Sequence, residues 1–376
     1  MMKQGTTSND PYSTLPADYT RAFKPADIRG VYPDEIDATV VYRVARAFVE
    51  EFRYKKVAVG YDMRESTPEL REAFIAGARD SGATVVDVGL CRSPYLYFAS
   101  GFLKLPGAMI TASHSPAEYN GIKLVAPEAV PLTAETGLAA IQKRVQAGDF
   151  TDARWRGALR KRGLRRQYRA HIMKHVDRNA SKGMHIIADI GNGMAGLSME
   201  ALDRALAAKF TLLFPEPDGS FPNRDSDPCL TKNQKALKAE IKATEADFGI
   251  GFDGDGDRIA FLDEKGRYVN CAAIGAIISE YLLEEEPGAG IVYTNLTSRI
   301  LEEVIVDSGG VPLRARVGHT FLKEKLREEG AVFGAEHSGH FFWRDFFNTD
   351  STMLTLLKII EIYAEHKAEG YTFSEM

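Results

Sequence analysis

Short apolar runs alternate with amphipathic stretches along most of this chain of 376 residues. The β-branched run Lys56–Gly60 predicts a strand, and apolar residues at helical spacing between Asp37 and Phe52 predict a helix. This order of elements occurs in residues 37–110, returns from 185 to 252, and returns again from 290 to 333. Such alternation is typical of βαβ units. We therefore predict an α/β protein with three topologically similar βαβ-type domains, whose mixed, mostly parallel sheets surround one central cleft.

Breaks in this pattern predict the domain boundaries. A chain of this length is too long for a single compact core, so several domains are expected. We place domain I at residues 1–158, domain II at 159–267 and domain III at 268–371, and residues 372–376 would begin a linker. The basic run Arg154–Arg169 is expected to be mostly helical and to connect the first two domains. Arg29, beside Gly30, is expected to lie in a loop.

Composition narrows the expected partners and location. The formal net charge is −5 with acids and bases interspersed, which argues against a nucleic-acid partner. Cys91, Cys229 and Cys271 lie far apart, so neither a disulfide framework nor a zinc knuckle is expected and a reducing cytoplasm fits best. The first 14 residues predict a disordered polar leader, and no apolar run is long enough to span a membrane. We expect a cytoplasmic protein without a membrane partner.

Each of the three repeats ends its last strand in a polar loop. The first loop is Thr111-Ala112-Ser113-His114-Ser115-Pro116, the second is D-G-D-G-D-R at 253–258, and the third is G-A-E-H-S-G-H at 334–340. Open α/β sheets bind ligands at the carboxyl edge of their strands. The three loops are therefore expected to face one cleft, and the Ser113 hydroxyl is the nucleophile candidate.

The second loop suggests a metal site. Asp253, Asp255 and Asp257 alternate with glycines, which allow a tight turn to aim three carboxylates at one point. Three hard anionic oxygens suit Mg²⁺ or Ca²⁺. A calcium-binding EF-hand is an alternative, because Glu264 would be its twelfth position, but Arg258 stands where that loop needs glycine. A solvated turn is the other alternative.

The third loop suggests a ligand-binding site. Glu336, Ser338 and His340 alternate along the chain around a glycine, and His319 lies in an earlier turn. A zinc site is the competing interpretation, but no cysteine is near and the histidine spacing matches no usual zinc pattern.

Together, T-A-S-H-S-P, D-G-D-G-D-R and G-A-E-H-S-G-H resemble the motifs of the α-D-phosphohexomutases, and residues 340–351 are most similar to bacterial phosphomannomutases. The resemblance implies an isomerase, an intramolecular phosphotransferase that interconverts mannose 6-phosphate and mannose 1-phosphate. It implies an enzyme phosphoserine, a bound hexose 1,6-bisphosphate intermediate and Mg²⁺ as cofactor. Alternatives are a phosphoglucomutase, a phosphoglucosamine mutase, or a catalytically impaired sugar-phosphate-binding remnant. Hexose phosphates are the expected partners of a monomer or weak dimer.

The resemblance also implies roles for individual residues. Ser113 would be the phosphoserine and would share the metal with the three aspartates. Arg258, His319, Glu336 and Ser338 would bind substrate. The groups expected around the transferred phosphoryl group are Arg29, His114, Lys123, Arg258 and His340, with Lys123 or His340 as general acid/base.

Two departures from the family pattern add expectations. Ser115 stands where these enzymes usually have Asn, which predicts a looser serine loop. The family has a fourth, C-terminal domain with a phosphate-gripping loop, and this sequence stops at Met376, about where that domain would start. We expect that domain to be missing and the activity of these 376 residues to be low.

Overall fold

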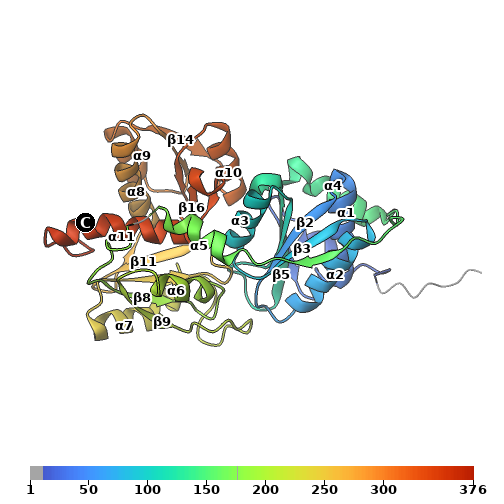
Figure 1. The fold of residues 1–376 in the computed structure, drawn as a ribbon, viewed down its shortest axis with the longest axis horizontal. Coiled ribbons are helices and arrows are strands. Elements are labelled where there is room, and N and C mark those ends of the chain that lie inside the picture. Colours follow the sequence, from blue (N-terminus) through green and yellow to red (C-terminus); the bar gives the residue numbers. More distant parts are fainter. Residues whose placement is uncertain (1–11, 176) are drawn as a thin grey trace, which may run out of the picture.

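A computed structural model describes residues 12–175 and 177–376 of the chain. It contains three sheets, each flanked by helices, with the first sheet at one end of the molecule and the other two side by side at the opposite end (Figure 1). Most of the expected polar leader lies outside the described residues. Across the two described ranges, no helix is both long and apolar enough to cross a membrane.

The first sheet has seven strands in the order β1-β5-β4-β2-β3-β7, with β6 paired to β5. Its strands are β1 Ile28–Val31, β2 Lys56–Tyr61, β3 Thr84–Leu90, β4 Gly107–Ile110, β5 Tyr119–Ala126, β6 Val130–Pro131 and β7 Leu159–Lys161. Its helices are α1 Ala38–Phe52, α2 Thr67–Asp80, α3 Ser93–Leu103 and α4 Ala139–Ala147. Helix α1 begins where expected, because the Asp37 carboxylate accepts a hydrogen bond from the Val40 amide at 2.8 Å.

The second sheet has the order β12-β11-β10-β8-β9. Its strands are β8 His185–Asp189, β9 Lys209–Leu213, β10 Phe248–Phe252, β11 Ile259–Asp263 and β12 Tyr268–Val269. Its helices are α6 Gly196–Asp203 and α7 Lys235–Thr244, and α5 Arg165–Met173 connects it to the first sheet.

The third sheet has the order β14-β13-β15-β16-β17. Its strands are β13 Gly290–Thr294, β14 Val311–Ala315, β15 Phe333–Ala335, β16 Phe341–Trp343 and β17 Thr349–Asp350. Its helices are α8 Cys271–Glu285, α9 Arg299–Asp307, α10 His319–Glu328 and α11 Thr352–Ala368.

The three sheets share one topology, as the repeated pattern predicted. The equivalent four-strand paths are β3-β2-β4-β5, β9-β8-β10-β11 and β14-β13-β15-β16. In each path the first three strands are parallel and the fourth is antiparallel, so parallel pairing makes up one half of each sheet. The loop from the third to the fourth strand is in every case the one that carries a sequence motif. The fold thus places the three loops at equivalent positions.

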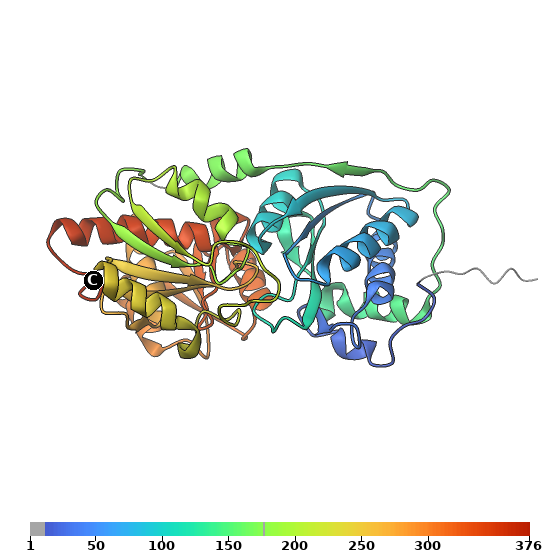
Figure 2. The ribbon, with the colours of Figure 1, turned by 90° about the horizontal axis from the view of Figure 1, so that it is seen from below.

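Two local expectations are wrong. The run Arg154–Arg169 is helical only from Arg165, because its middle forms β7, which pairs with the edge of β3 and there satisfies its backbone groups. Figure 2 shows this segment running along the first sheet. Strand β7 therefore belongs to the first sheet although it lies beyond residue 158. Arg29, expected in a loop, lies within β1.

Candidate active site

The serine loop and the acidic loop touch at Ser113. The Ser113 hydroxyl donates to Asp253 Oδ2 at 2.8 Å, and both side chains are buried. The Ser226 hydroxyl donates to the Ser113 carbonyl at 3.0 Å and accepts from the Gly254 amide at 2.9 Å. Ser113 has a φ of 54°, a left-handed conformation that is uncommon for a residue with a side chain. Contacts with the second domain thus hold the candidate nucleophile in a constrained position.

Arg64, which the sequence patterns did not identify, organises the backbone of the serine loop. Its buried guanidinium donates to the Pro116 and Tyr119 carbonyls at 2.6 and 2.8 Å, and to the Ser113 and Ser115 carbonyls at 2.9 and 2.6 Å. Four acceptors on one planar cation fix the loop shape. The only signal in the sequence was its place in the loop after β2, which reaches the same sheet edge as the loop after β4.

Lys123 pairs with two of the three aspartates. Its ammonium lies 2.6 Å from Asp255 Oδ2 and 2.5 Å from Asp257 Oδ2, and all three side chains are buried. Burial opposes ionisation of both carboxyls, but this ammonium holds the pKa of Asp255 and Asp257 below the usual value. Burial and repulsion by its two neighbours instead raise the pKa of Asp253 well above normal. One ammonium offsets only one of the two carboxylate charges of Asp255 and Asp257, so the acidic loop retains a negative charge that Lys123 does not compensate.

The acidic loop fits a hard divalent cation. One oxygen from each of Asp253, Asp255 and Asp257 lies within 4.8 Å of the others, and Oδ1 of Asp255 and of Asp257 is buried with no hydrogen-bond partner in residues 12–175 and 177–376. An all-oxygen anionic donor set suits Mg²⁺ or Ca²⁺. The EF-hand alternative is wrong, because strands β10 and β11 flank the loop and Glu264 accepts a bond from the distant Ser374 hydroxyl at 2.6 Å.

His340 joins the third domain to Arg258 of the second. Arg258 Nε donates to His340 Nε2 at 3.0 Å, so a ring proton is assigned to Nδ1, which faces Asp350 Oδ2 at 3.4 Å. Lys323 Nζ lies 2.9 Å from the other oxygen of Asp350, and despite burial this ammonium lowers the pKa of Asp350 to about 2. The rings of His319 and His340 stack at 5.7 Å. Asp350 and Lys323 were not predicted as site residues.

Arg29 and His114 lie beside Ser113. Arg29 donates to the Ser115 hydroxyl at 3.1 Å. Ser115 is therefore held by both Arg29 and Arg64, and the expectation of a looser loop stays a prediction. His114 Nδ1 is 3.4 Å from the Ser113 hydroxyl oxygen. Burial lowers the pKa of His114 to about 2, and the positive charges of Arg258 and Arg29 add to this effect. The ring is therefore neutral at neutral pH.

The sugar-recognition candidates of the third loop are available to a ligand. Glu336 is buried at the end of β15, and its carboxylate accepts no hydrogen bond from the described residues. The Ser338 hydroxyl is buried and also has no partner among those residues. The Gly339 carbonyl accepts from the Ile259 amide at 3.0 Å, which joins this loop to β11. The structure thus links the three loops through Ser113–Asp253, Arg258–His340 and Ile259–Gly339, and leaves the side chains of Glu336 and Ser338 without a partner among the described residues.

Comparison with known proteins identifies the family. Residues 20–152 match "Phosphoglucomutase/phosphomannomutase, alpha/beta/alpha domain I", residues 166–266 match domain II, and residues 271–376 match domain III of the same family. The chain belongs to the phosphoglucomutase/phosphomannomutase family. This confirms the predicted superfamily of α-D-phosphohexomutases and the three-domain α/β fold.

Individual members of the phosphoglucomutase/phosphomannomutase family are similar over most of the chain. A protein of Xanthomonas campestris named phosphohexose mutases is 38% identical over 94% of this chain and 78% of its own length. The phosphomannomutase of Salmonella montevideo is 35% identical over 90% of this chain and 76% of its own length. A crystal structure of a family protein from Burkholderia thailandensis is 33% identical, covers 93% of this chain and 78% of its own, and superimposes with a TM-score of 0.87. The chain is therefore an enzyme of the phosphohexose mutase type, an intramolecular phosphotransferase.

Proposed function

We propose that this enzyme interconverts mannose 6-phosphate and mannose 1-phosphate through a phosphoserine at Ser113. The observation that carries this proposal is the 2.8 Å contact between the Ser113 hydroxyl and Asp253, where two domains meet and a third lies beside them. The phosphomannomutase relatives support mannose as the sugar. Glucose and glucosamine phosphates are the alternative substrates on the same scaffold.

The reaction would pass one phosphoryl group in each of two steps. The group on Ser113 Oγ moves to the free hydroxyl of the hexose monophosphate, which gives a 1,6-bisphosphate and leaves the serine hydroxyl. The bisphosphate reorients in the cleft. Its other phosphoryl group then moves to Ser113 Oγ, which restores the phosphoserine. The product leaves with its phosphate at the new position. Such transfers depend mainly on positioning and on stabilisation of charge on the phosphoryl oxygens.

The residues near Ser113 can supply that stabilisation. Mg²⁺ held by Asp253, Asp255 and Asp257 would add positive charge beside the phosphoryl oxygens. Arg29 already bonds the serine loop, and Arg258 is fixed by His340, so both guanidinium groups are positioned before substrate arrives.

Proton transfer is assigned to Lys123 or His340. The Nε2 atom of His340 accepts from Arg258, so its lone pair is occupied. The Lys123 ammonium is likewise occupied by Asp255 and Asp257, which, despite burial, raise its pKa well above the usual value. Each candidate must therefore exchange a present contact for the sugar hydroxyl, and both are kept for the proposed general acid/base.

The experiment that tests the proposal offers mannose, glucose and glucosamine 1-phosphates in parallel, with Mg²⁺ and the matching 1,6-bisphosphate. We expect conversion of mannose 1-phosphate with the highest kcat/KM, and no conversion in the Ser113→Ala variant. A higher kcat/KM with glucose or glucosamine 1-phosphate would assign that sugar as the substrate instead. Inertness toward all three sugars would contradict the enzymatic proposal for this chain.

A further inference from the structure

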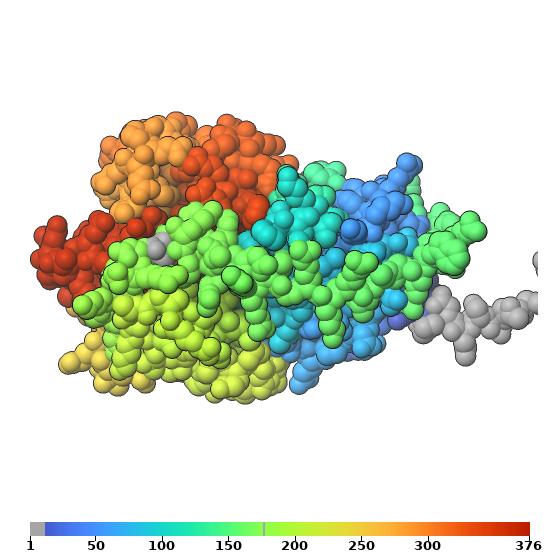
Figure 3. All heavy atoms as spheres, viewed as in Figure 1, coloured from blue at the N-terminus to red at the C-terminus, as the bar shows by residue number. Residues whose placement is uncertain are grey.

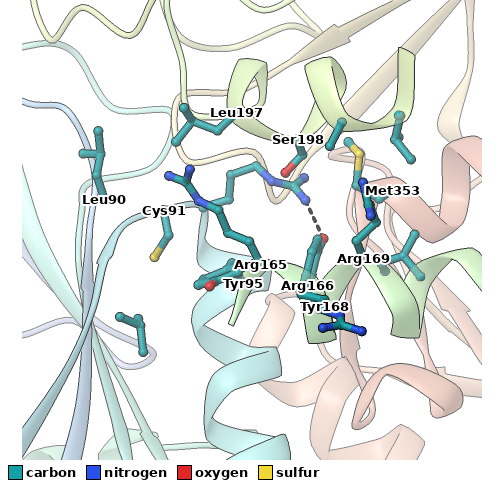
Figure 4. Close-up of a pocket in the computed structure, with 15 residues that line it drawn as sticks. Leu90, Cys91, Tyr95, Arg165, Arg166, Tyr168, Arg169, Leu197, Ser198 and Met353 are labelled. Carbon is teal, nitrogen blue, oxygen red and sulfur yellow. Dashed lines mark hydrogen bonds between the residues drawn. The ribbon is translucent and has the colours of Figure 1, made fainter. Parts of the chain in front are cut away.

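A cavity of about 300 Å³ lies apart from the three loops, between strand β3, helix α5 and helix α6 (Figure 4). Most of its wall is apolar and comes from all three domains, including Leu90, Leu197 and Met353. It shares no lining residue with the candidate active site. Its volume is at the lower end of the range of small-molecule sites, roughly 300 to 1,000 Å³.

The polar side of this cavity is strongly cationic. Arg165, Arg166 and Arg169 of α5 line it together with Arg92, and no aspartate or glutamate does. Figure 4 shows the α5 arginines across the cavity from Leu197 and Ser198. Among the described residues, none of the three α5 arginines forms an ion pair, although the chain as a whole carries a net charge of −5. In space-filling view, α5 lies on the molecular surface (Figure 3), so a ligand can reach this side from solvent.

Among the described residues, the buried guanidinium of Arg92 has no carboxylate partner. Its side chain is 1% exposed. In the part of the chain that the structure describes, it donates only to neutral hydroxyls, those of Thr352 at 3.0 Å and Tyr168 at 2.5 Å, and its buried Nε has no hydrogen-bond partner there. An uncompensated charge in an apolar environment is unfavourable. An anion in the cavity would compensate it.

We infer that this cavity binds a small ligand that joins a phosphate or carboxylate group to an apolar body. The arginines would hold the anionic end, because guanidinium groups bind such groups through paired hydrogen bonds. The apolar wall would cover the remainder of the ligand. Inorganic phosphate alone would leave that wall exposed to water and should bind weakly.

The ligand would act on the acidic loop through Arg92. Thr352, which accepts from Arg92, donates to the Gly256 carbonyl at 2.9 Å. The approach is close, since a Cβ added at Gly256 would lie 2.7 Å from Arg92 Cδ. Ser93, the next residue, donates a hydrogen bond to Asp255. Binding in the cavity is therefore a route to regulation of the acidic loop, and this regulatory consequence rests on the proposed function.

Binding is tested with the fluorescent anion 8-anilinonaphthalene-1-sulfonate as probe, displaced by 1-naphthyl phosphate, 1-naphthol or inorganic phosphate. We expect 1-naphthyl phosphate to displace it at least tenfold better than either of the other two. Arg166→Gln removes one cation and Ala201→Trp fills the cavity, and each should weaken binding about tenfold or more. The matched controls Arg162→Gln and Ala207→Trp change exposed residues outside the lining and should bind as the wild type does.

Equal binding by wild type, Arg166→Gln and Ala201→Trp would overturn the inference, as would equal displacement by 1-naphthol and 1-naphthyl phosphate. Arg166 is exposed, so its variant tests the site even if the tryptophan variant fails to fold. Coupling between the cavity and the acidic loop is measured by amide hydrogen exchange at residues 253–258, which should slow when 1-naphthyl phosphate binds. Unchanged exchange there would overturn the link to the acidic loop. Neither measurement depends on mutase activity, so failure of the proposed function would be recognised separately.

Discussion

Asp255 and Asp257 share one buried ammonium group, that of Lys123, and this sets how each titrates. In the wild type their lowered pKa values contribute stability that is present above pH of about 4 and lost in acid. In Lys123→Met, burial and repulsion would raise both pKa values, so the native state would bind protons more tightly than the unfolded state. We expect its free energy of unfolding to fall as pH rises from about 4 to 8.

Urea unfolding without Mg²⁺, at several pH values, measures how the free energy of unfolding of each variant changes with pH. Lys325→Met is the control, because it removes a lysine that is paired with Glu329 at the surface of α10. Parallel pH dependences for Lys123→Met and the wild type would contradict the assigned electrostatics.

Arg64 is a second residue whose effect can be isolated. Lysine keeps its charge but cannot reach the four carbonyls that the guanidinium binds in the serine loop. Loss of two such bonds, each worth about 1.5–3 kcal/mol, should lower the free energy of unfolding by ~3 kcal/mol or more in Arg64→Lys. Chemical denaturation checks this, with the exposed Arg162→Lys as control. Equal stability of the two variants would show that Arg64 does not hold the loop.

Among the helices and strands, the βαβ repeats could be predicted because the third strand of each repeat is short, apolar and followed by a distinct polar motif. It did not predict α8 and α11, because their buried residues surround the helix and leave no single apolar stripe. Arg64 and Asp350 were not predicted as site residues for a different reason. Their partners are backbone carbonyls or side chains distant in sequence, and only the folded chain brings these together. The domain boundaries proposed at 158 and 267 stay predictions.

The contact between the serine loop and the acidic loop can be weakened without touching a catalytic candidate. Ser226→Ala removes the hydroxyl that bonds both the Ser113 carbonyl and the Gly254 amide. Two lost bonds should lower stability by roughly 1–3 kcal/mol, and kcat should fall more than KM changes, because the reacting hydroxyl is displaced. Ser220→Ala, whose bonds are local to Asp218, should change neither quantity. An unaltered kcat in Ser226→Ala would contradict the positioning role.

At the scale of the whole molecule, one cation should stabilise the contact between the first two domains. The acidic loop of the second domain receives Lys123 and Ser93 from the first, and three carboxylates of the loop lie close enough to share an ion. At a concentration about 100 times its Kd, Mg²⁺ should add about 2.7 kcal/mol to the free energy of unfolding. Thermal unfolding with Mg²⁺ or with a chelator measures this. Asp255→Asn should show a much smaller Mg²⁺ effect, and an undiminished effect would place the ion elsewhere.

The proposed reaction requires Ser113 to pass a phosphoryl group to and from a hexose phosphate. Mass spectrometry of the peptide that contains Ser113 tests this transfer, before and after unlabelled mannose 1-phosphate is added to protein treated with an isotope-labelled 1,6-bisphosphate. We expect a peptide heavier by one labelled phosphoryl group, and no such peptide in Ser113→Ala. When substrate is added, the label should pass to the sugar phosphate and an unlabelled phosphoryl group should replace it on Ser113. A labelled phosphoryl group that stays on Ser113 after substrate addition, or wild-type turnover by Ser113→Ala, would contradict the proposed transfer.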